Sequence, residues 1–206
     1  MIRIESLTKK FGQQTVFENL NLNIPLNKTT VLSGPSGSGK TTLLRIIAGL
    51  DSDYTGNISG VPGAVSFMFQ EDRLLPWRSV KGNIEFVLKS VMEESETDAA
   101  IARILEGIRL SGHEDKFPSS LSGGMKRRAS LARALCYPYE LLILDEPFNG
   151  LDSQLKDDIL LLFKKLFVDT EKTAIIVTHD REVIQKLGCN EIDLSEYSYL
   201  PKKTAL

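Results

Sequence analysis

The sequence predicts an α/β fold in which a mostly parallel sheet is joined by an N-terminal antiparallel β subdomain and interrupted by an inserted α-helical subdomain. Short β-rich apolar runs have the length and composition of buried parallel strands, at residues 29–33, 64–69, 141–144 and 173–178. A block with the helical spacing of apolar residues separates the second run from the third. The first 30 residues are instead β-rich and hairpin-like.

Composition and charge are those of an ordinary globular domain. The 206 residues are 42% hydrophobic and 25% charged, which suits a single domain over residues 1–206. The net charge of −2 argues against nucleic acid as a partner. No apolar run approaches the roughly 18 residues that a membrane span needs, and the N-terminus lacks a secretion signal. Because Cys136 and Cys189 are isolated from each other and from any His cluster, we expect free thiols in a reducing, cytoplasmic compartment.

The N-terminal segment is predicted to form a hairpin and then the first strand of the parallel sheet. Residues 2–7 and 16–24 flank a turn centred on Gly12, and a proline follows the second strand. Residues 29–33 form the next strand. A helix is expected to begin near residues 39–40, since residues 42–48 have helical spacing and end at Gly49, which is a suitable C-cap residue.

The connection between this strand and this helix carries the pattern G-x-x-x-x-G-K-[ST], which binds the phosphates of a nucleotide. Glycines let the backbone turn tightly and approach the phosphates, and the start of the helix presents unpaired N–H groups to them. Lys40 would reach the β- and γ-phosphates, and the Thr41 hydroxyl would bind Mg²⁺. The pattern predicts a P-loop NTPase core whose nucleotide-binding residues are Gly34, Pro35, Ser36, Gly37, Ser38, Gly39, Lys40, Thr41 and Thr42.

The block between residues 69 and 141 is predicted to be helical. Ser79 would cap a helix that runs to Met92, and Thr97 would cap another that runs to Leu110. A third helix is expected over residues 125–135.

The start of that third helix is a second candidate anion site. Ser122 is a suitable N-cap residue, and Gly123 and Gly124 leave the first N–H groups of the helix open. One nucleotide cannot easily use both this helix start and the phosphate loop within a single chain. We therefore expect that a second molecule supplies one of the two.

Two acidic residues follow a buried strand later in the chain. Residues 141–144 are all apolar, and Asp145 and Glu146 come directly after them. Ligand sites of α/β sheets form at the carboxyl ends of the strands, so both carboxylates are expected beside the phosphate loop. Asp145 would hold the hydration shell of Mg²⁺. Glu146 would polarise the attacking water, a role that typically contributes about 10²–10⁴-fold in rate.

These motifs, with Gln70, Gly150-Leu151-Asp152 and Thr178-His179, occur in an order and spacing that resembles the ATP-binding cassette of ABC transporters. The resemblance runs from Phe11 to about residue 180. It implies an ATP-binding core over residues 1–69 and 136–206 and a helical subdomain over about residues 70–135. It also implies an ATPase that uses ATP and Mg²⁺.

The resemblance assigns roles to individual residues around the nucleotide. Phe11 stacks on adenine, unless it is instead a core residue of the hairpin. Gln70 touches Mg²⁺ and the attacking water, unless it is an exposed loop residue. His179 hydrogen-bonds the γ-phosphate. The implied catalytic residues are Glu146, His179, Gln70 and Lys40, and the implied metal site is Thr41, Gln70 and Asp145.

The resemblance also implies that two cassettes, identical or paired, sandwich two ATP molecules. Ser122, Gly123 and Gly124 would contact the γ-phosphate held by the partner, and Asp152 would couple the two sites. In such a pair ATP joins the two cassettes and its hydrolysis releases them.

Residues 74–77, Leu-Leu-Pro-Trp, resemble the corresponding segment of importers of nitrate, sulfonates, taurine and pyrimidine precursors of thiamine. Met125, where most signatures carry Gln, is also frequent in that group of importers. Trp77 would lie in a groove that receives a permease helix, so a transmembrane permease is expected to dock near Gln70–Trp77, with a solute-binding protein as an indirect partner. The alternative is a Trp packed inside the helical subdomain. We expect a peripheral location on the inner face of the cell membrane.

The basic run at residues 126–128 is interpreted as mostly a solvated helix face. Arg128 and Arg133 match positions of the family, whereas Arg127 replaces a common Gln. These changes leave the backbone donors of the signature intact, so activity is expected to survive.

Two other functions remain open from the residues alone. One is an efflux or lipoprotein-release cassette, and the other is a non-transport ABC ATPase acting on ribosomes or DNA. The short helices between Gln70 and Ser122, without sustained heptads, argue against the DNA-repair type. After residue 180 the chain has only residues 192–194 and a polar tail, in which we expect no regulatory domain.

Overall fold

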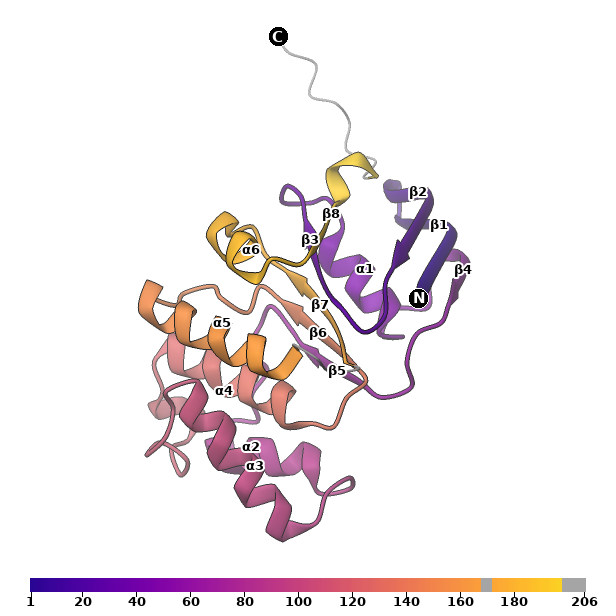
Figure 1. The fold of residues 1–206 in the computed structure, drawn as a ribbon. Helices are drawn as coiled ribbons and strands as arrows, with labels where there is room; N and C mark the ends of the chain where they lie inside the picture. The colour runs from indigo at the N-terminus through magenta and orange to yellow at the C-terminus, as the bar shows by residue number, and fades with distance from the viewer. Residues whose placement is uncertain (168–171, 198–206) are drawn as a thin grey trace.

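A computed structural model describes residues 1–167 and 172–197. The chain forms two sheets with helices packed around them (Figure 1). One sheet is antiparallel and N-terminal, and the other is parallel and central. The predicted fold class is therefore confirmed. The predicted polar tail after residue 197 lies outside the described residues.

The antiparallel sheet is built from β1 (Ile2–Phe11), β2 (Gln14–Ile24) and β4 (Thr55–Ser59), in the order β2-β1-β4. The predicted hairpin is confirmed, and Gly12 in its turn has a φ of 57°. The sequence did not predict β4. Four of the five residues of β4 are exposed, so it lacks the apolar pattern by which the other strands were found.

The central sheet has five parallel strands in the order β5-β6-β7-β3-β8, namely β3 (Thr29–Ser33), β5 (Val65–Met68), β6 (Leu141–Asp145), β7 (Thr173–Val177) and β8 (Asn190–Asp193). Every residue of β6 and β7 is buried because both faces of the sheet are covered. Leu141 and Ile143 belong to the core on one face, and Leu142 and Leu144 belong to the core on the other.

Helix α1 (Lys40–Ile47) fills the space between the two sheets, and its Leu43 and Leu44 are fully buried there (Figure 1). The opposite face of the central sheet is covered by α2 (Val80–Leu88), α3 (Glu94–Gly107), α4 (Gly123–Cys136) and α5 (Ser153–Phe167). Helix α6 (Arg181–Leu187) and two short 3₁₀ turns, Pro118–Ser120 and Leu194–Glu196, complete the fold.

Two of the three predicted helix caps are confirmed. The Ser79 hydroxyl accepts a hydrogen bond from Gly82 N (3.1 Å), and that of Ser122 accepts one from Met125 N (3.3 Å). Helix α2 ends at Leu88 rather than at the predicted Met92.

The predicted cap at Thr97 is wrong. Helix α3 begins at Glu94, so Thr97 lies inside its first turn. The Thr97 hydroxyl donates to Glu93 O at 3.0 Å, which is the bond that a threonine makes to the preceding turn within a helix. Helix α3 also ends at Gly107, before the predicted Leu110.

Both cysteines carry free thiols, as expected. Burial raises the pKa of the Cys136 thiol to about 12. Among the described residues, no helix has both the length and the apolar character that crossing a membrane requires.

Candidate nucleotide-binding site

The phosphate loop opens onto a cleft of about 400 Å³ between the β1–β2 hairpin and the carboxyl ends of β5 and β6. Residues of the phosphate loop and both residues of the acidic pair line this cleft. Its lining residues are Phe11, Gln14, Val16, Ser36, Gly37, Gly39, Lys40, Thr41, Thr42, Gln70, Asp145, Glu146 and Val177.

Gly39 is required where the phosphate loop passes under the hairpin. Its φ is 90°, in the left-handed region that side chains disfavour. A Cβ at this position would lie 2.5 Å from Phe17 Cζ and 2.7 Å from Val16 Cγ1. Close packing against the hairpin therefore brings the start of α1 to the floor of the cleft, where its first N–H groups are open to an anion.

Lys40 is the first residue of α1, and its ammonium folds back over the loop. The Lys40 Nζ donates to Gly34 O and to Pro35 O, both at 2.8 Å. These bonds hold a positive charge above the loop beside the cleft. Gly34, Pro35 and Ser38 belong to the same loop but do not line the cleft, and Ser38 is fully buried.

Thr41 and Asp145 form the link between the phosphate loop and β6. The Thr41 hydroxyl donates to Asp145 Oδ2 at 2.7 Å. Burial raises the pKa of Asp145, the Thr41 hydrogen bond opposes this rise, and the charge of Glu146 adds to it. The other oxygen, Oδ1, is buried without a hydrogen-bond partner among the described residues. A hydroxyl and a carboxylate with an unpaired oxygen are ligands that suit Mg²⁺, so the residues fit this ion.

Glu146 follows β6 in a strained conformation. Its φ is 53°, which is uncommon for a residue other than glycine. Its N–H donates to Val177 O at 2.9 Å, and its Oε1 lies 3.0 Å from His179 Nδ1. The Glu146 side chain is 12% exposed, and its Oε2 has no partner among the described residues. The His179 side chain, 70% exposed, orients the carboxylate from the solvent side.

Phe11 and Gln70 both line the cleft, and Gln70 is also an exposed residue of the loop after β5, as the alternative interpretation held. Phe11 is 52% exposed, so the alternative of a hairpin core residue is wrong. The Lys9 ammonium lies 4.6 Å from the centre of the Phe11 ring and 2.9 Å from Asp51 Oδ1, which fixes the ring at the mouth of the cleft.

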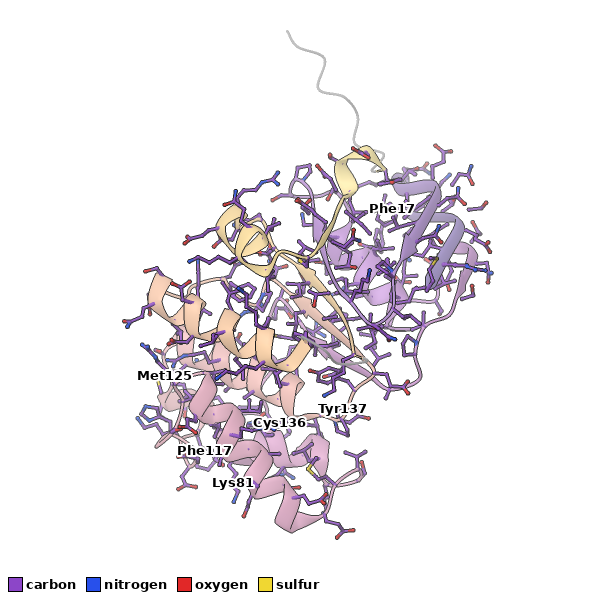
Figure 2. The ribbon with its side chains drawn as sticks, in the orientation of Figure 1. Phe17, Lys81, Phe117, Met125, Cys136 and Tyr137 are labelled. Carbon is purple, nitrogen blue, oxygen red and sulfur yellow. The ribbon has the colours of Figure 1, made fainter. Side chains whose placement is uncertain are left out.

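The predicted signature residues lie outside the cleft, which none of Ser122, Gly123, Gly124 and Asp152 lines. Figure 2 shows Met125, next to the signature, well separated from Phe17, which packs against the phosphate loop. The Asp152 carboxylate caps α5 by accepting from Leu155 N at 3.0 Å. Within one chain, therefore, the signature helix and the phosphate loop do not share a site.

Arg127 was not predicted as a residue of the site, and the interpretation of residues 126–128 as mostly a solvated helix face is wrong for this side chain. Arg127 is 6% exposed and points under the cleft, where it donates to the carbonyls of Gln70 and Glu146. Helical spacing carried a signal, since Arg127 lies three and four residues before the buried Ser130 and Leu131, on the same face of α4. Gln14, Val16 and Val177 were also missed as lining residues.

Comparison with known sequences finds the family described as ABC transporter, which matches residues 17–149. The sulfate/thiosulfate import ATP-binding protein CysA of Yersinia pseudotuberculosis serotype I (strain IP32953) is 36% identical over 210 residues, or 95% of this chain and 58% of CysA. The aliphatic sulfonates import ATP-binding protein SsuB of Rhodopseudomonas palustris (strain BisA53) is 39% identical over 183 residues, or 87% of this chain and 65% of SsuB. The chain thus spans less than two thirds of the length of these relatives.

Two solved structures share the fold. One is the dimeric structure of MJ0796, a bacterial ABC transporter cassette, with a TM-score of 0.83 and 28% identity over 94% of this chain and 95% of that chain. The other is a dimeric post-hydrolysis state of MJ0796 bound to ADP and Pi, with a TM-score of 0.81 and 29% identity over 90% and 91% of the two chains. With its phosphate loop and acidic pair in one cleft and the family match over residues 17–149, the chain belongs to the ABC transporter family.

Proposed function

We propose that the chain is the ATP-binding and ATP-hydrolysing subunit of an ABC transporter. The observation that carries the proposal is the 2.7 Å bond between Thr41 of the phosphate loop and Asp145, which is followed directly by Glu146. This bond joins the phosphate-binding loop to β6, so that two candidate metal ligands and a candidate general base line one cleft.

The loop and the hairpin bind the nucleotide in this proposal. The N–H groups at the start of α1 and the Lys40 ammonium hold the phosphates, and Phe11 stacks on adenine. Thr41, Asp145 and Gln70 hold Mg²⁺, which when bound neutralises phosphate charge. The contacts of Lys40 with Gly34 O and Pro35 O keep the ammonium at the rim of the loop.

Hydrolysis then requires a base for the attacking water. The water oxygen forms a bond to the γ-phosphorus, the bond from that phosphorus to the β,γ-bridging oxygen breaks, and the water proton passes to Glu146. Glu146 Oε2 has no hydrogen-bond partner among the described residues, whereas Oε1 already faces His179. Oε2 is therefore the oxygen suited to accept this proton. His179 and Gln70 orient the γ-phosphate and the water.

We further propose that two chains, or this chain and a paired cassette, enclose two ATP molecules. Support comes from the separation of Ser122, Gly123 and Gly124 from the cleft, which leaves this capped helix start for the nucleotide of a partner. MJ0796 was solved as a dimer. Within each chain, the proposed parts are the ATP-binding core, residues 1–69 and 136–206, and the helical subdomain, about residues 70–135.

The purified chain is expected to release phosphate from ATP in the presence of Mg²⁺ and to lose this activity when EDTA removes the metal. The physical reason is that Asp145 and Thr41 would then face the triphosphate without a cation to offset its charge. Phosphate release measured against ATP concentration tests this expectation. Equal release with and without EDTA would overturn the proposed metal site, and no release under any condition would overturn the ATPase proposal.

The transporter is proposed to be an importer of a small solute of the sulfate or sulfonate class, attached to the inner face of the membrane through its permease. CysA and SsuB, by their names, are import ATP-binding proteins for such solutes. Trp77 is 70% exposed, so the alternative that it packs inside the helical subdomain is wrong, and Phe86 nearby on α2 is 55% exposed. Exposed large apolar side chains suit a docking site for a permease helix. A solute-binding protein would act through the permease.

Replacing Trp77 with alanine is expected to spare ATP-dependent dimerisation but to uncouple ATPase activity from transport. Trp77 touches solvent rather than the cleft, so its loss removes apolar contact area with the permease alone. Affinity purification from membranes should recover the permease with the wild-type chain and not with the variant. Leu161→Ala, which removes a 55% exposed apolar side chain from α5, is the control. Normal transport by the Trp77 variant in reconstituted vesicles would contradict the docking site, and recovery of ribosomes or DNA instead of a permease would overturn the importer proposal.

A further inference from the structure

The Arg127 side chain makes four hydrogen bonds to backbone carbonyls from two distant parts of the chain. One terminal nitrogen donates to Phe69 O at 2.9 Å and to Gln70 O at 2.7 Å. The other donates to Asp145 O at 2.5 Å and to Glu146 O at 2.7 Å. Asp72 Oδ1, at 3.4 Å, supplies the only carboxylate within ion-pair distance of Arg127 in the described part of the chain. Its position on α4 therefore connects the signature helix to both walls of the cleft.

Three of the four carbonyls that Arg127 binds belong to residues that line the cleft. Gln70 and Asp145 line it as candidate ligands of Mg²⁺, and Glu146 lines it as the candidate base. Glu146 has a left-handed backbone, a conformation that persists only where the surrounding structure holds it. One Arg127 nitrogen donates to the carbonyl before Glu146, Asp145 O, and to Glu146 O itself. These two bonds hold the backbone on both sides of Glu146.

The geometry of these bonds depends on a guanidinium group. Arginine presents five N–H groups in a rigid planar fork, and four of them are used here by four carbonyls. A glutamine has two N–H donors and a lysine has three on one atom, so neither can hold all four carbonyls in a plane. Since Arg127 is 6% exposed, water cannot replace the lost donors without opening the site.

The segment that begins at Gln70 has a second anchor on the same helix. Arg133, also on α4, donates to Arg73 O at 2.9 Å and to Asp72 O at 3.3 Å. The segment from Phe69 to Arg73 is thus held to α4 by two arginines, and it leads directly to the exposed Trp77. A displacement of α4 would move Gln70 relative to the phosphate loop.

We propose that Arg127 is a positioning residue that holds Gln70 and the strained backbone of Glu146 in the arrangement that ATP hydrolysis needs, and so couples the signature helix to the cleft. The inference rests on the proposed ATPase function. It concerns the rate of turnover rather than the binding of ATP, because Arg127 contacts neither the phosphate loop nor Phe11.

The test compares Arg127→Met and Arg127→Gln with a matched control, Lys126→Met. Lys126 is the preceding residue of α4, and its side chain has no hydrogen bond or ion pair within the described ranges, so the control removes one positive charge from the same turn. Each full-length variant is measured for turnover, for affinity of a fluorescent ATP analogue, and for backbone hydrogen exchange without nucleotide.

Arg127→Met is expected to lower kcat by about 10²-fold, as for a misplaced catalytic group, with little change in affinity for the ATP analogue. Hydrogen exchange should accelerate in residues 69–73 and 145–149 and remain unchanged in the phosphate loop. Arg127→Gln should fall between Arg127→Met and the wild type because it restores two donors, and Lys126→Met should match the wild type.

Localised exchange separates positioning from general destabilisation. Acceleration spread equally over the chain, or unchanged exchange at residues 69–73 and 145–149, would overturn the proposal. If Arg127→Met does not fold, the same criteria are applied to Arg127→Gln. If the wild type shows no turnover, the proposed function fails, and the exchange pattern alone still decides whether Arg127 holds these two segments.

Discussion

Replacing Glu146 with glutamine is expected to lower ATP turnover by about 10²–10⁴-fold, the usual contribution of a general base. Glutamine has nearly the same shape, and Arg127 bonds the backbone of this residue rather than its side chain. The variant therefore keeps the strained conformation and the contact with His179, but its amide cannot accept a proton. ATP should still bind, and because hydrolysis is needed to release the cassettes, an ATP-bound homodimer should accumulate.

Phosphate release and gel filtration with Mg²⁺ and ATP measure the two parts of this prediction. Glu106→Gln is the matched control, because Glu106 is exposed on α3 and its carboxylate has no hydrogen-bond partner in residues 1–167 and 172–197. The control should turn over ATP and remain in the wild-type monomer–dimer equilibrium. Turnover by Glu146→Gln near the wild-type rate would remove Glu146 from the role of base. A loss of turnover without a trapped dimer would leave the base in place and contradict the sandwich of two cassettes.

The parts of the fold predicted from the sequence are those whose residues carry a local signal. Strand β3 was predicted with the bounds 29–33 that it has, since five β-rich residues, four of them buried, precede a motif of fixed spacing. The caps at Ser79 and Ser122 were predicted because a serine hydroxyl bonds the N–H three residues later. Thr97 carries the same local signal, but its hydroxyl donates to Glu93 O in the preceding turn instead. The burial of Thr97 on α3 is decided by tertiary packing.

Arg127 shows why part of the candidate site was not predictable. In sequence it is one of three consecutive basic residues, and such runs are usually solvated. Its burial depends on four carbonyls, two from the residues after β5, one from the last residue of β6 and one from the residue after it, up to 58 positions away in the chain. A carbonyl carries no residue-specific signal, so no motif marks the partners of this side chain. The phosphate loop was predictable for the opposite reason, because its donors and its lysine are contiguous.

Replacing Lys40 with alanine is expected to weaken nucleotide binding by about 100-fold or more. Hydrogen bonds to charged groups each contribute about 1.5–3 kcal/mol, and 1.4 kcal/mol corresponds to a tenfold change in affinity, so the loss of two such bonds accounts for this effect. The Lys40 ammonium already lies 2.8 Å from two carbonyls of the loop, Gly34 O and Pro35 O, and is thereby held where the β- and γ-phosphates are expected. Titration with a fluorescent ATP analogue measures the change.

The control for this experiment is Lys165→Ala, which removes an exposed lysine of α5 and should leave the affinity unchanged. Thermal unfolding of both variants without nucleotide checks that the loop itself still folds, since Lys40 also bonds Gly34 O and Pro35 O. A folded Lys40→Ala variant that binds the analogue as tightly as the wild type would contradict the phosphate role. Because Lys40 lies in the loop and Glu146 follows β6, the two variants separate binding from hydrolysis: the first should lose the nucleotide, and the second should keep it without turning it over.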